Sequence, residues 1–311
     1  MAAITAAMVK ELREMTGAGM MDCKKALGET DGNMDEAVEY LRKNGQAKAE
    51  KKAGRIAAEG LCAVLVKGDD ASIVEVNSET DFVAKNADFK AFVEAVAEQA
   101  INSSSADIDA FMDESWHLES GKTVKEALTD KVAVIGENLS IRRFEHIKAD
   151  GGFIVSYVHA GGRIGVLVSV KSDVDNDALR EAATNIAMQI AALNPKYVSQ
   201  KDVEQSYIEH EKEIIRAQIE NDPKEAAKPD KVKEGMIMGR ISKEMKEICL
   251  LDQVYVKAED GKQSVAKYIE QVGKENGAAF SVSQFIRFET GEGIEKKQEN
   301  FAEEVAKQMN A

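Results

Sequence analysis

Two short stretches of this 311-residue chain contain residue types that could bind phosphate or calcium, but neither has the required spacing. Gly121-Lys122-Thr123 resembles the end of a phosphate-binding loop, yet Trp116 stands where that pattern needs its first glycine. The acidic run 173–177 resembles a calcium loop, but Ala178 and Thr184 replace the glycine and glutamate that such a loop needs at positions six and twelve. We therefore interpret the first stretch as a helix N-cap and the second as a solvated turn.

The histidines and cysteines form no reactive group either. The four histidines show no H-E-x-x-H spacing, the three cysteines form no C-x-x-C pair, and there is no G-x-S-x-G elbow. These patterns predict that the chain is not an enzyme and holds no metal or cofactor. Because the cysteines are few and unpaired, and no basic leader or long apolar run occurs, we expect a cytoplasmic protein without a membrane span.

The charge balance narrows the class of partner. Asp and Glu number 55 against 41 Lys and Arg, which gives a net charge of −14. Binding to nucleic acid or to an anionic membrane requires a cationic face, so we expect neither as a partner. The balance fits a protein that acts on another protein, with local basic residues such as Lys24 as candidate contacts.

The segment 75–86 (EVNSETDFVAKN) is the strongest candidate site. In one interpretation Thr80 or Asp81 caps the helix that follows and Phe82 is a core residue. In the other, Asp81 and Phe82 lie at a corner between loop and helix, where a carboxylate beside an aromatic ring can enter the surface of a partner. Periodicity alone does not choose between the two.

The elements that must position these residues begin with three short helices. Thr5 is the expected N-cap of the first helix, and Gly17 ends it. Cys23 lies in the second, and the third begins at Asn33 and is expected to stop at Gly45. The basic run 42–55 then predicts a solvated helical linker.

A repeated pattern follows. Alternating apolar residues in 61–76 predict a β-hairpin followed by an amphipathic helix. Val74 and Val76 recur as Val166 and Val168, 92 residues later, within a second hairpin that is followed by a helix over about 177–193. We infer an internal duplication of a strand-turn-strand-helix unit.

The region after Pro195 is purely helical before a mixed pattern returns. Ser199 and Asp202 are expected to start a long charged helix, which pairs with a second helix that carries Met238, Ile241, Met245 and Ile248 on a thin apolar seam. A helix near 265–276 and a strand over 280–288 follow. A final helix carries Phe301, Val305 and Met309.

Four segments resemble signatures of the elongation factor Ts family, in the family's order. The first two are 12–27 (LREMTGAGMMDCKKAL) and the 75–86 segment. The third is 156–168, which contains Ser156-Tyr157-Val158-His159, and the fourth is 285–295 (FIRFETGEGIE). Two stretches depart from the pattern: the family often has a proline where this chain has Val254, and the region around Trp116 matches no feature.

The resemblance implies an α+β architecture with five parts. These are an N-terminal three-helix ubiquitin-associated-like domain with its linker, the two halves of a duplicated strand-turn-strand-helix core, an inserted antiparallel coiled-coil hairpin and a C-terminal helix. The expected bounds are 1–55 for the three-helix domain, 56–148 for the first core half, 149–198 with 247–290 for the second half, 199–246 for the hairpin and 291–311 for the C-terminal module.

The resemblance also implies a function. The chain would be a translation elongation factor that promotes release of GDP from elongation factor Tu, without binding the nucleotide itself. Asp81 and Phe82 would disturb the partner's Mg²⁺ site, with Thr80 and Val83 shaping the corner. Further partner contacts are expected at Leu12, Met20, Met21, Lys24, His159, Tyr255 and Val256.

Some alternatives stay open at this point. Leu12 fits either the core of the three-helix domain or a contact, and a homodimer through the helical hairpin is one arrangement among several. A plain adaptor that binds through residues 1–55 is the first rival function, and a nucleotide-hydrolysing enzyme is the second. Direct binding of GTP or GDP to the chain would separate the enzyme from the other two.

Overall fold

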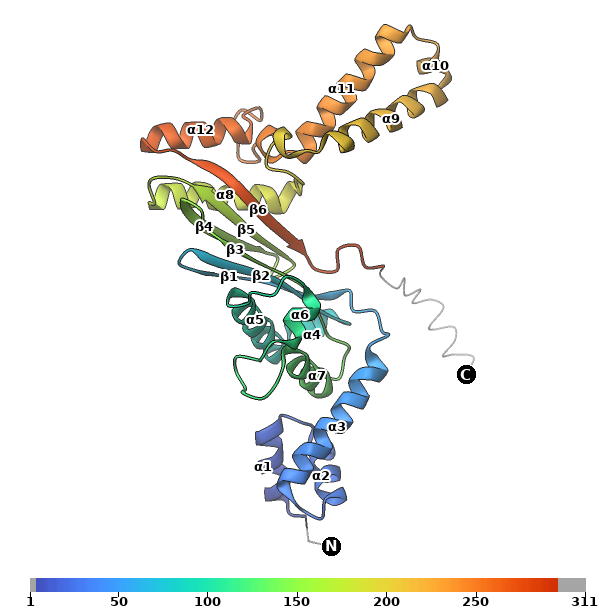
Figure 1. Ribbon diagram of the computed structural model, residues 1–311, viewed down its shortest axis with the longest axis vertical. Helices are drawn as coiled ribbons and strands as arrows, with labels where there is room; N and C mark the ends of the chain where they lie inside the picture. The colour runs from blue at the N-terminus through green and yellow to red at the C-terminus, as the bar shows by residue number, and fades with distance from the viewer. Residues whose placement is uncertain (1–3, 296–311) are drawn as a thin grey trace.

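The computed structural model describes residues 4–295, which form a mixed α/β protein (Figure 1). Within that range there are twelve α-helices and two three-stranded antiparallel sheets. No helix among these residues is long and apolar enough to cross a membrane. The expected helix around Phe301 lies outside the described residues.

Three helices form the N-terminal part: α1 (Ala6–Thr16), α2 (Met20–Glu29) and α3 (Met34–Lys52). The Thr5 side chain accepts a hydrogen bond from the Met8 amide, and Gly17 ends α1 in the left-handed conformation, at φ 67°. A small apolar core holds the three helices together and contains Val9, Leu12, Cys23, Ala26, Leu27 and Ala37.

The prediction that α3 stops at Gly45 was wrong, because α3 continues to Lys52. Gly45 is buried, and a Cβ atom placed there would lie 3.2 Å from the Cβ of Ala133 in α7 (Val124–Ile135). This glycine therefore permits a close approach of two helices and does not end one. The helical part of the linker was predicted correctly.

The first sheet contains β1 (Glu59–Lys67), β2 (Asp70–Ser78) and β3 (Ser140–Lys148) in that order. Helix α5 (Ala87–Ile101) covers its outer face. Strand β2 directs its buried valines and α5 its phenylalanines into a shared core, which includes Val74, Val76, Phe89, Phe92, Val93 and Val96.

The second sheet repeats this arrangement. Strands β4 (Gly152–His159) and β5 (Ile164–Lys171) form the predicted hairpin, and α8 (Asp177–Leu193) covers it. Strand β6 (Ser281–Glu289) pairs with β5 as β3 pairs with β2, and α12 (Val265–Asn276) packs beside α8. Both sheets have the same strand order and the same helix position, which is the arrangement that the inferred duplication predicts.

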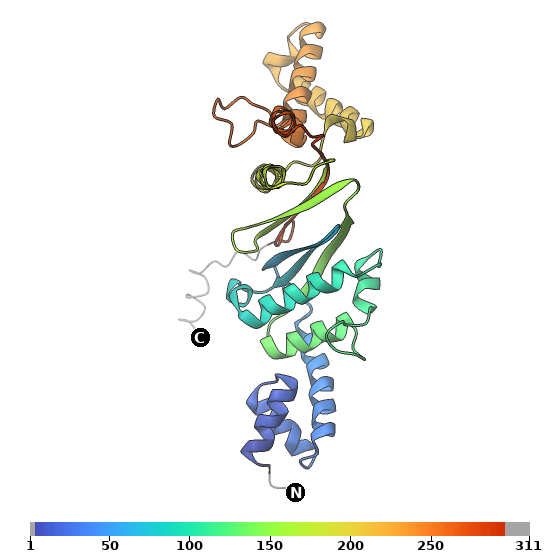
Figure 2. The same ribbon diagram turned by 90° about the vertical axis from the view of Figure 1, so that its left-hand side faces the viewer.

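The inner faces of the two sheets pack against each other, with the helices outside (Figure 2). Cys62, Ile73, Ile154, Leu167 and Phe288 fill the space between the sheets. Burial in this layer raises the pKa of the Cys62 thiol to about 11.

One buried ion network also joins the two halves. The fully buried Glu75 carboxylate of β2 accepts hydrogen bonds from Arg142 (3.0 Å) and Arg143 (2.6 Å) of β3. It also accepts one from the Gly291 amide (2.8 Å), just beyond β6. Because these partners satisfy a buried charge, they hold the end of the second half against the first.

A helical hairpin projects from the second half (Figure 1). It consists of α9 (Gln205–Asn221), α10 (Pro223–Ala226) and α11 (Asp230–Ile248). Two details differ from expectation. Ser199 begins only a 3₁₀ turn (Gln200–Asp202), and Ile237 lies in the apolar seam in place of Met238, which is exposed.

The chain between α5 and α7 contains a short helix that the sequence analysis did not predict, α6 (Ile108–Asp113). The loop after it buries Trp116, whose ring lies 5.9 Å from that of Phe92. The Trp116 region therefore contributes to the core of the first half. A second 3₁₀ turn, Leu250–Asp252, leads from the hairpin back to the second half.

Candidate functional site

The 75–86 segment forms a corner at the end of β2. A one-turn helix, α4 (Asp81–Lys85), stands between β2 and α5. Thr80 is its N-cap and accepts a hydrogen bond from the Val83 amide at 3.3 Å. Phe82 is 80% exposed, so it is not the core residue that one interpretation expected.

The sequence explains why α4 is so short. Asn86 ends it and also caps α5, because its side chain accepts hydrogen bonds from the amides of Asp88 (2.8 Å) and Phe89 (3.3 Å). Ala84 is buried and Val83 packs against the first-half core. With Val83 and Ala84 directed inward, the neighbouring Phe82 is directed outward.

A carboxylate from another part of the chain holds this corner. Glu137 accepts hydrogen bonds from the amides of Glu79 (3.1 Å) and Thr80 (3.0 Å), and from the Thr80 hydroxyl (2.6 Å). The sequence analysis missed Glu137, which lies 57 residues from Thr80. The glycine before it, which ends α7 at φ 87°, was the only local signal of a special position.

The acidic residue of the corner is paired locally. Lys85 donates a hydrogen bond of 2.6 Å to Asp81, and this bond lowers the pKa of the Asp81 carboxyl. The Lys85 ammonium also lies 6.0 Å from the centre of the Phe82 ring. The corner thus presents an apolar ring beside an ionised carboxylate.

The predicted N-terminal contact residues divide into two groups. Met20 and Met21 are 55% and 74% exposed at the start of α2, and Lys24 is exposed one turn later. Leu12 is fully buried in the three-helix core. Of the two interpretations of Leu12, the structure supports the core.

The second half holds the other three predicted residues. His159 is exposed at the end of β4, where its Nδ1 lies 3.0 Å from the Tyr157 hydroxyl. Val256 is half exposed, but Tyr255 is buried with its ring stacked on Tyr268 at 4.1 Å. The structure does not gather these residues around Phe82, because they belong to elements spread along the long axis of the molecule (Figure 1).

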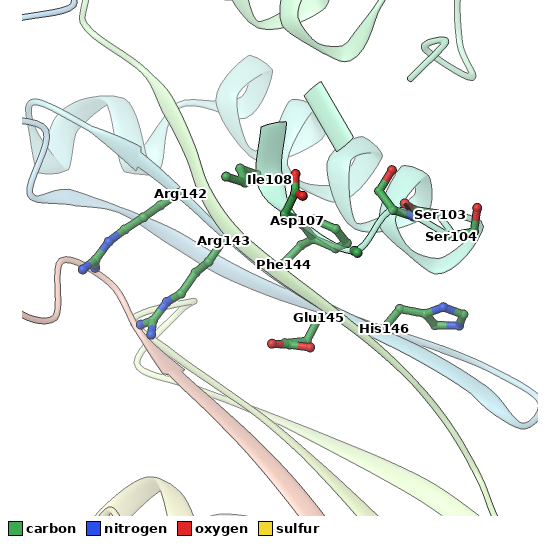
Figure 3. A pocket seen from close by; sticks show the side chains of 11 residues that line it. Ser103, Ser104, Asp107, Ile108, Arg142, Arg143, Phe144, Glu145 and His146 are labelled. Carbon is green, nitrogen blue, oxygen red and sulfur yellow. Dashed lines mark hydrogen bonds between the residues drawn. The ribbon is translucent and has the colours of Figure 1, made fainter. Parts of the chain in front are cut away.

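Two cavities border the first half. A pocket of about 380 Å³ is lined by 103–108 and 142–146. Its basic side chains do not converge, because Arg142 and Arg143 point away from Ser103 and Asp107 (Figure 3). A larger groove of about 830 Å³ lies between the N-terminal helices and α5 and α7, and Trp116 lines it. In residues 4–295 no group of three His, Cys, Asp or Glu side chains could hold a metal ion.

Comparison with known proteins identifies the family. The sequence model of the family Elongation factor TS matches residues 79–292, which include Thr80, Asp81 and Phe82. The chain is 52% identical to elongation factor Ts of Clostridium botulinum (strain Eklund 17B / Type B) over 308 residues, which cover 98% of this chain and 99% of that protein. It is 52% identical to elongation factor Ts of Clostridium perfringens (strain 13 / Type A) over 306 residues, covering 98% of each chain. The chain therefore belongs to the elongation factor Ts family of translation elongation factors.

Proposed function

We propose that this chain is a guanine nucleotide exchange factor for elongation factor Tu. It binds the GDP form of that protein, disturbs the Mg²⁺ and phosphate site and so promotes GDP release. The chain has no catalytic chemistry of its own and does not bind nucleotide directly.

The observation that carries this proposal is the exposed ring of Phe82 on an anchored corner. Exposure of a phenylalanine ring to water is unfavourable. Burial of the ring by a partner removes this unfavourable free energy and contributes about 1.5–3 kcal/mol to binding. The ring stands on a helix that is held by Thr80, Glu137 and the buried Ala84. Little conformational entropy is therefore lost when the ring inserts. Asp81 places a negative charge beside the ring, where it competes with groups that position a cation.

Insertion of one ring offsets only part of the affinity for a tightly held nucleotide, so the rest must come from a wide interface. Met20, Met21 and Lys24 supply one exposed surface on the N-terminal helices. His159 and Val256 supply another on the second half. We assign Leu12 and Tyr255 a supporting role beneath these surfaces, since both are buried.

The proposed coupling is reciprocal. If this chain weakens the binding of GDP to the partner by some factor, GDP weakens the binding of this chain by the same factor. The ternary complex can then dissociate in either direction, as exchange requires.

The remaining family features are part of the same proposal. Residues 1–55 act as a ubiquitin-associated-like module, 56–148 and 149–198 with 247–290 as the core halves, 199–246 as a coiled-coil hairpin and 291–311 as the C-terminal module. We propose a cytoplasmic location and no membrane or nucleic-acid partner. A homodimer through the hairpin is the arrangement to test by sedimentation.

The test is the release rate of a fluorescent GDP from elongation factor Tu with and without this chain. We expect a large acceleration by the unaltered chain, and no acceleration would overturn the proposal. A plain adaptor would bind the partner through 1–55 and leave the release rate unchanged. Binding of labelled GDP to the chain alone would instead support an enzyme.

A further inference from the structure

The turn that follows α7 contacts both the Phe82 corner and the helix that carries the N-terminal module. It comprises Gly136, Glu137 and Asn138, and we call it the α7 turn. We propose that Glu137 is a positioning residue that holds the Phe82 corner in its insertion geometry. This inference rests on the proposed exchange function.

Glu137 satisfies three donors of the corner with one carboxylate. One oxygen accepts from the amides of Glu79 and Thr80, at 3.1 and 3.0 Å. The other accepts from the Thr80 hydroxyl at 2.6 Å. Both amides are partly shielded from water, so they would lose part of their hydrogen bonding without this carboxylate.

The bond to the hydroxyl also sets the N-cap of α4. Because the Thr80 proton is directed to Glu137, a lone pair of the same oxygen remains for the Val83 amide, 3.3 Å away. This arrangement fixes the rotamer of Thr80 and with it the start of α4. The orientation of Phe82 on α4 therefore depends on Glu137.

The α7 turn also donates a hydrogen bond to the corner. The Asn138 amide donates a hydrogen bond of 2.6 Å to the Glu79 carboxylate. Glu137 and Glu79 thus each bind backbone amides of the other's segment. Such a reciprocal pair resists displacement in either direction better than one bond does.

The same turn is bonded to the end of α3. Lys52 donates to the Gly136 carbonyl, and the Asn138 side chain donates to the Arg55 carbonyl at 2.7 Å. Helix α3 belongs to the N-terminal module that exposes Met20 and Met21. The α7 turn therefore sets the spacing between two surfaces that the proposed function uses together.

A double-mutant cycle tests this role. Glu137→Ala should lower the maximal rate of stimulated GDP release about tenfold, which corresponds to about 1.4 kcal/mol. Glu137→Gln should restore part of the rate, because its amide oxygen can accept from the two backbone amides while its NH₂ group donates to Thr80. In a Phe82→Ala background, Glu137→Ala should have little further effect, since the residue acts through Phe82.

Glu94→Ala is the matched control, because Glu94 is an exposed carboxylate on α5 with no polar side-chain partner among residues 4–295. It should leave the release rate unchanged. An unchanged rate in Glu137→Ala, or an equal loss with and without Phe82, would overturn the positioning role. If Glu137→Ala does not fold, the GDP release rate of Glu137→Gln is compared with and without Phe82→Ala instead.

Amide hydrogen exchange of the free chain separates this inference from the exchange function. Glu137→Ala should raise the exchange rate of the Glu79, Thr80 and Val83 amides at least tenfold, while amides in α8 stay as protected as before. If the unaltered chain does not accelerate GDP release, the proposed function fails, but hydrogen exchange still tests whether Glu137 holds the corner. Unchanged protection at all three amides would show that Glu137 does not hold the corner.

Discussion

The two halves of the core repeat one unit, but they differ at the joint between the second strand and the helix. In the first half the joint is 79–86 and contains α4 with the exposed Phe82. In the second half the joint is 172–176 and contains no helix. The longer joint has room for one helical turn that directs a ring away from the core.

The second joint is bonded both to itself and to distant segments, because Asp173 accepts a hydrogen bond from the Ala279 amide at 2.9 Å and the Ser172 amide donates to the Gly151 carbonyl at 3.0 Å. The Ser172 hydroxyl donates to the Val174 carbonyl at 2.7 Å and accepts from the Val174 amide at 3.2 Å. Val174 packs against the second-half core, and Asp175 is paired with Arg180 at 2.6 Å. A duplicated fold therefore does not imply a duplicated site, because the site depends on the residues inserted at the joint.

Removing the Phe82 ring should have the largest effect, because this exposed ring is what distinguishes the first joint from the second. We expect Phe82→Ala to lower stimulated GDP release about 10- to 100-fold, since the lost burial amounts to about 1.5–3 kcal/mol. The free energy of unfolding should hardly change, because Phe82 is exposed in the free chain. The measurement is the release rate of fluorescent GDP, with Met238→Ala on α11 as an exposed apolar control.

If Phe82→Ala matched the unaltered chain, the insertion of the ring would be wrong while the exchange function could stand. A loss of equal size in Met238→Ala would instead indicate a general effect of exposed apolar residues.

Weakening the cap of the first joint should have a smaller effect. Thr80→Val removes the hydroxyl that binds Glu137 and the Val83 amide. We expect a loss of about 1 kcal/mol in the free energy of unfolding in urea, and a fall in GDP release smaller than that of Phe82→Ala. Thr80→Ser keeps the hydroxyl and should restore both values; failure to do so would assign the effect to the methyl group.

The equivalent change in the second joint should affect stability alone. Asn176 caps α8 by accepting from the Leu179 amide at 2.9 Å. Asn176→Ala should lower the free energy of unfolding by about 1 kcal/mol and leave GDP release per folded molecule unchanged. A selective loss of GDP release at full stability would show that the second joint also takes part in exchange.

The smallest expected effect is a change in the titration of Asp81. The hydrogen bond from Lys85 lowers the pKa of Asp81 in the folded chain. The pair therefore stabilises the fold above the ordinary pKa of an aspartate, and that stabilisation is lost as the pH falls through the depressed pKa. Lys85→Ala should raise the pKa of Asp81 towards its ordinary value in an NMR titration, whereas no rise would remove Lys85 as the cause.

Much of the fold follows from local patterns. Thr5, Gly17 and Thr123 begin or end helices where their residue types predict, and the 92-residue repeat predicted the two matching hairpins. These features depend on caps, turns and periodicity, which act over a few residues.

Other features depended on neighbours that local patterns do not show. Glycine is typical of a helix end, but α7 packs closely against α3 at Gly45. The small size of this residue therefore serves helix packing. Met238 and Ile237 both fit the periodicity of α11, and only packing against α9 selects Ile237. The place of Trp116 in the first-half core was likewise decided by contacts distant in sequence.

For the candidate site, the sequence by itself determined the residue types, a helix cap at Thr80 or Asp81 and the family signature around Phe82. It did not determine whether Phe82 is buried, because both interpretations fit the same periodicity. Only the tertiary structure placed Glu137 against Thr80, directed Val83 and Ala84 inward and left Phe82 in solvent. The physical reason is that burial and long-range hydrogen bonds depend on how separate segments pack, whereas caps and turns depend on adjacent residues.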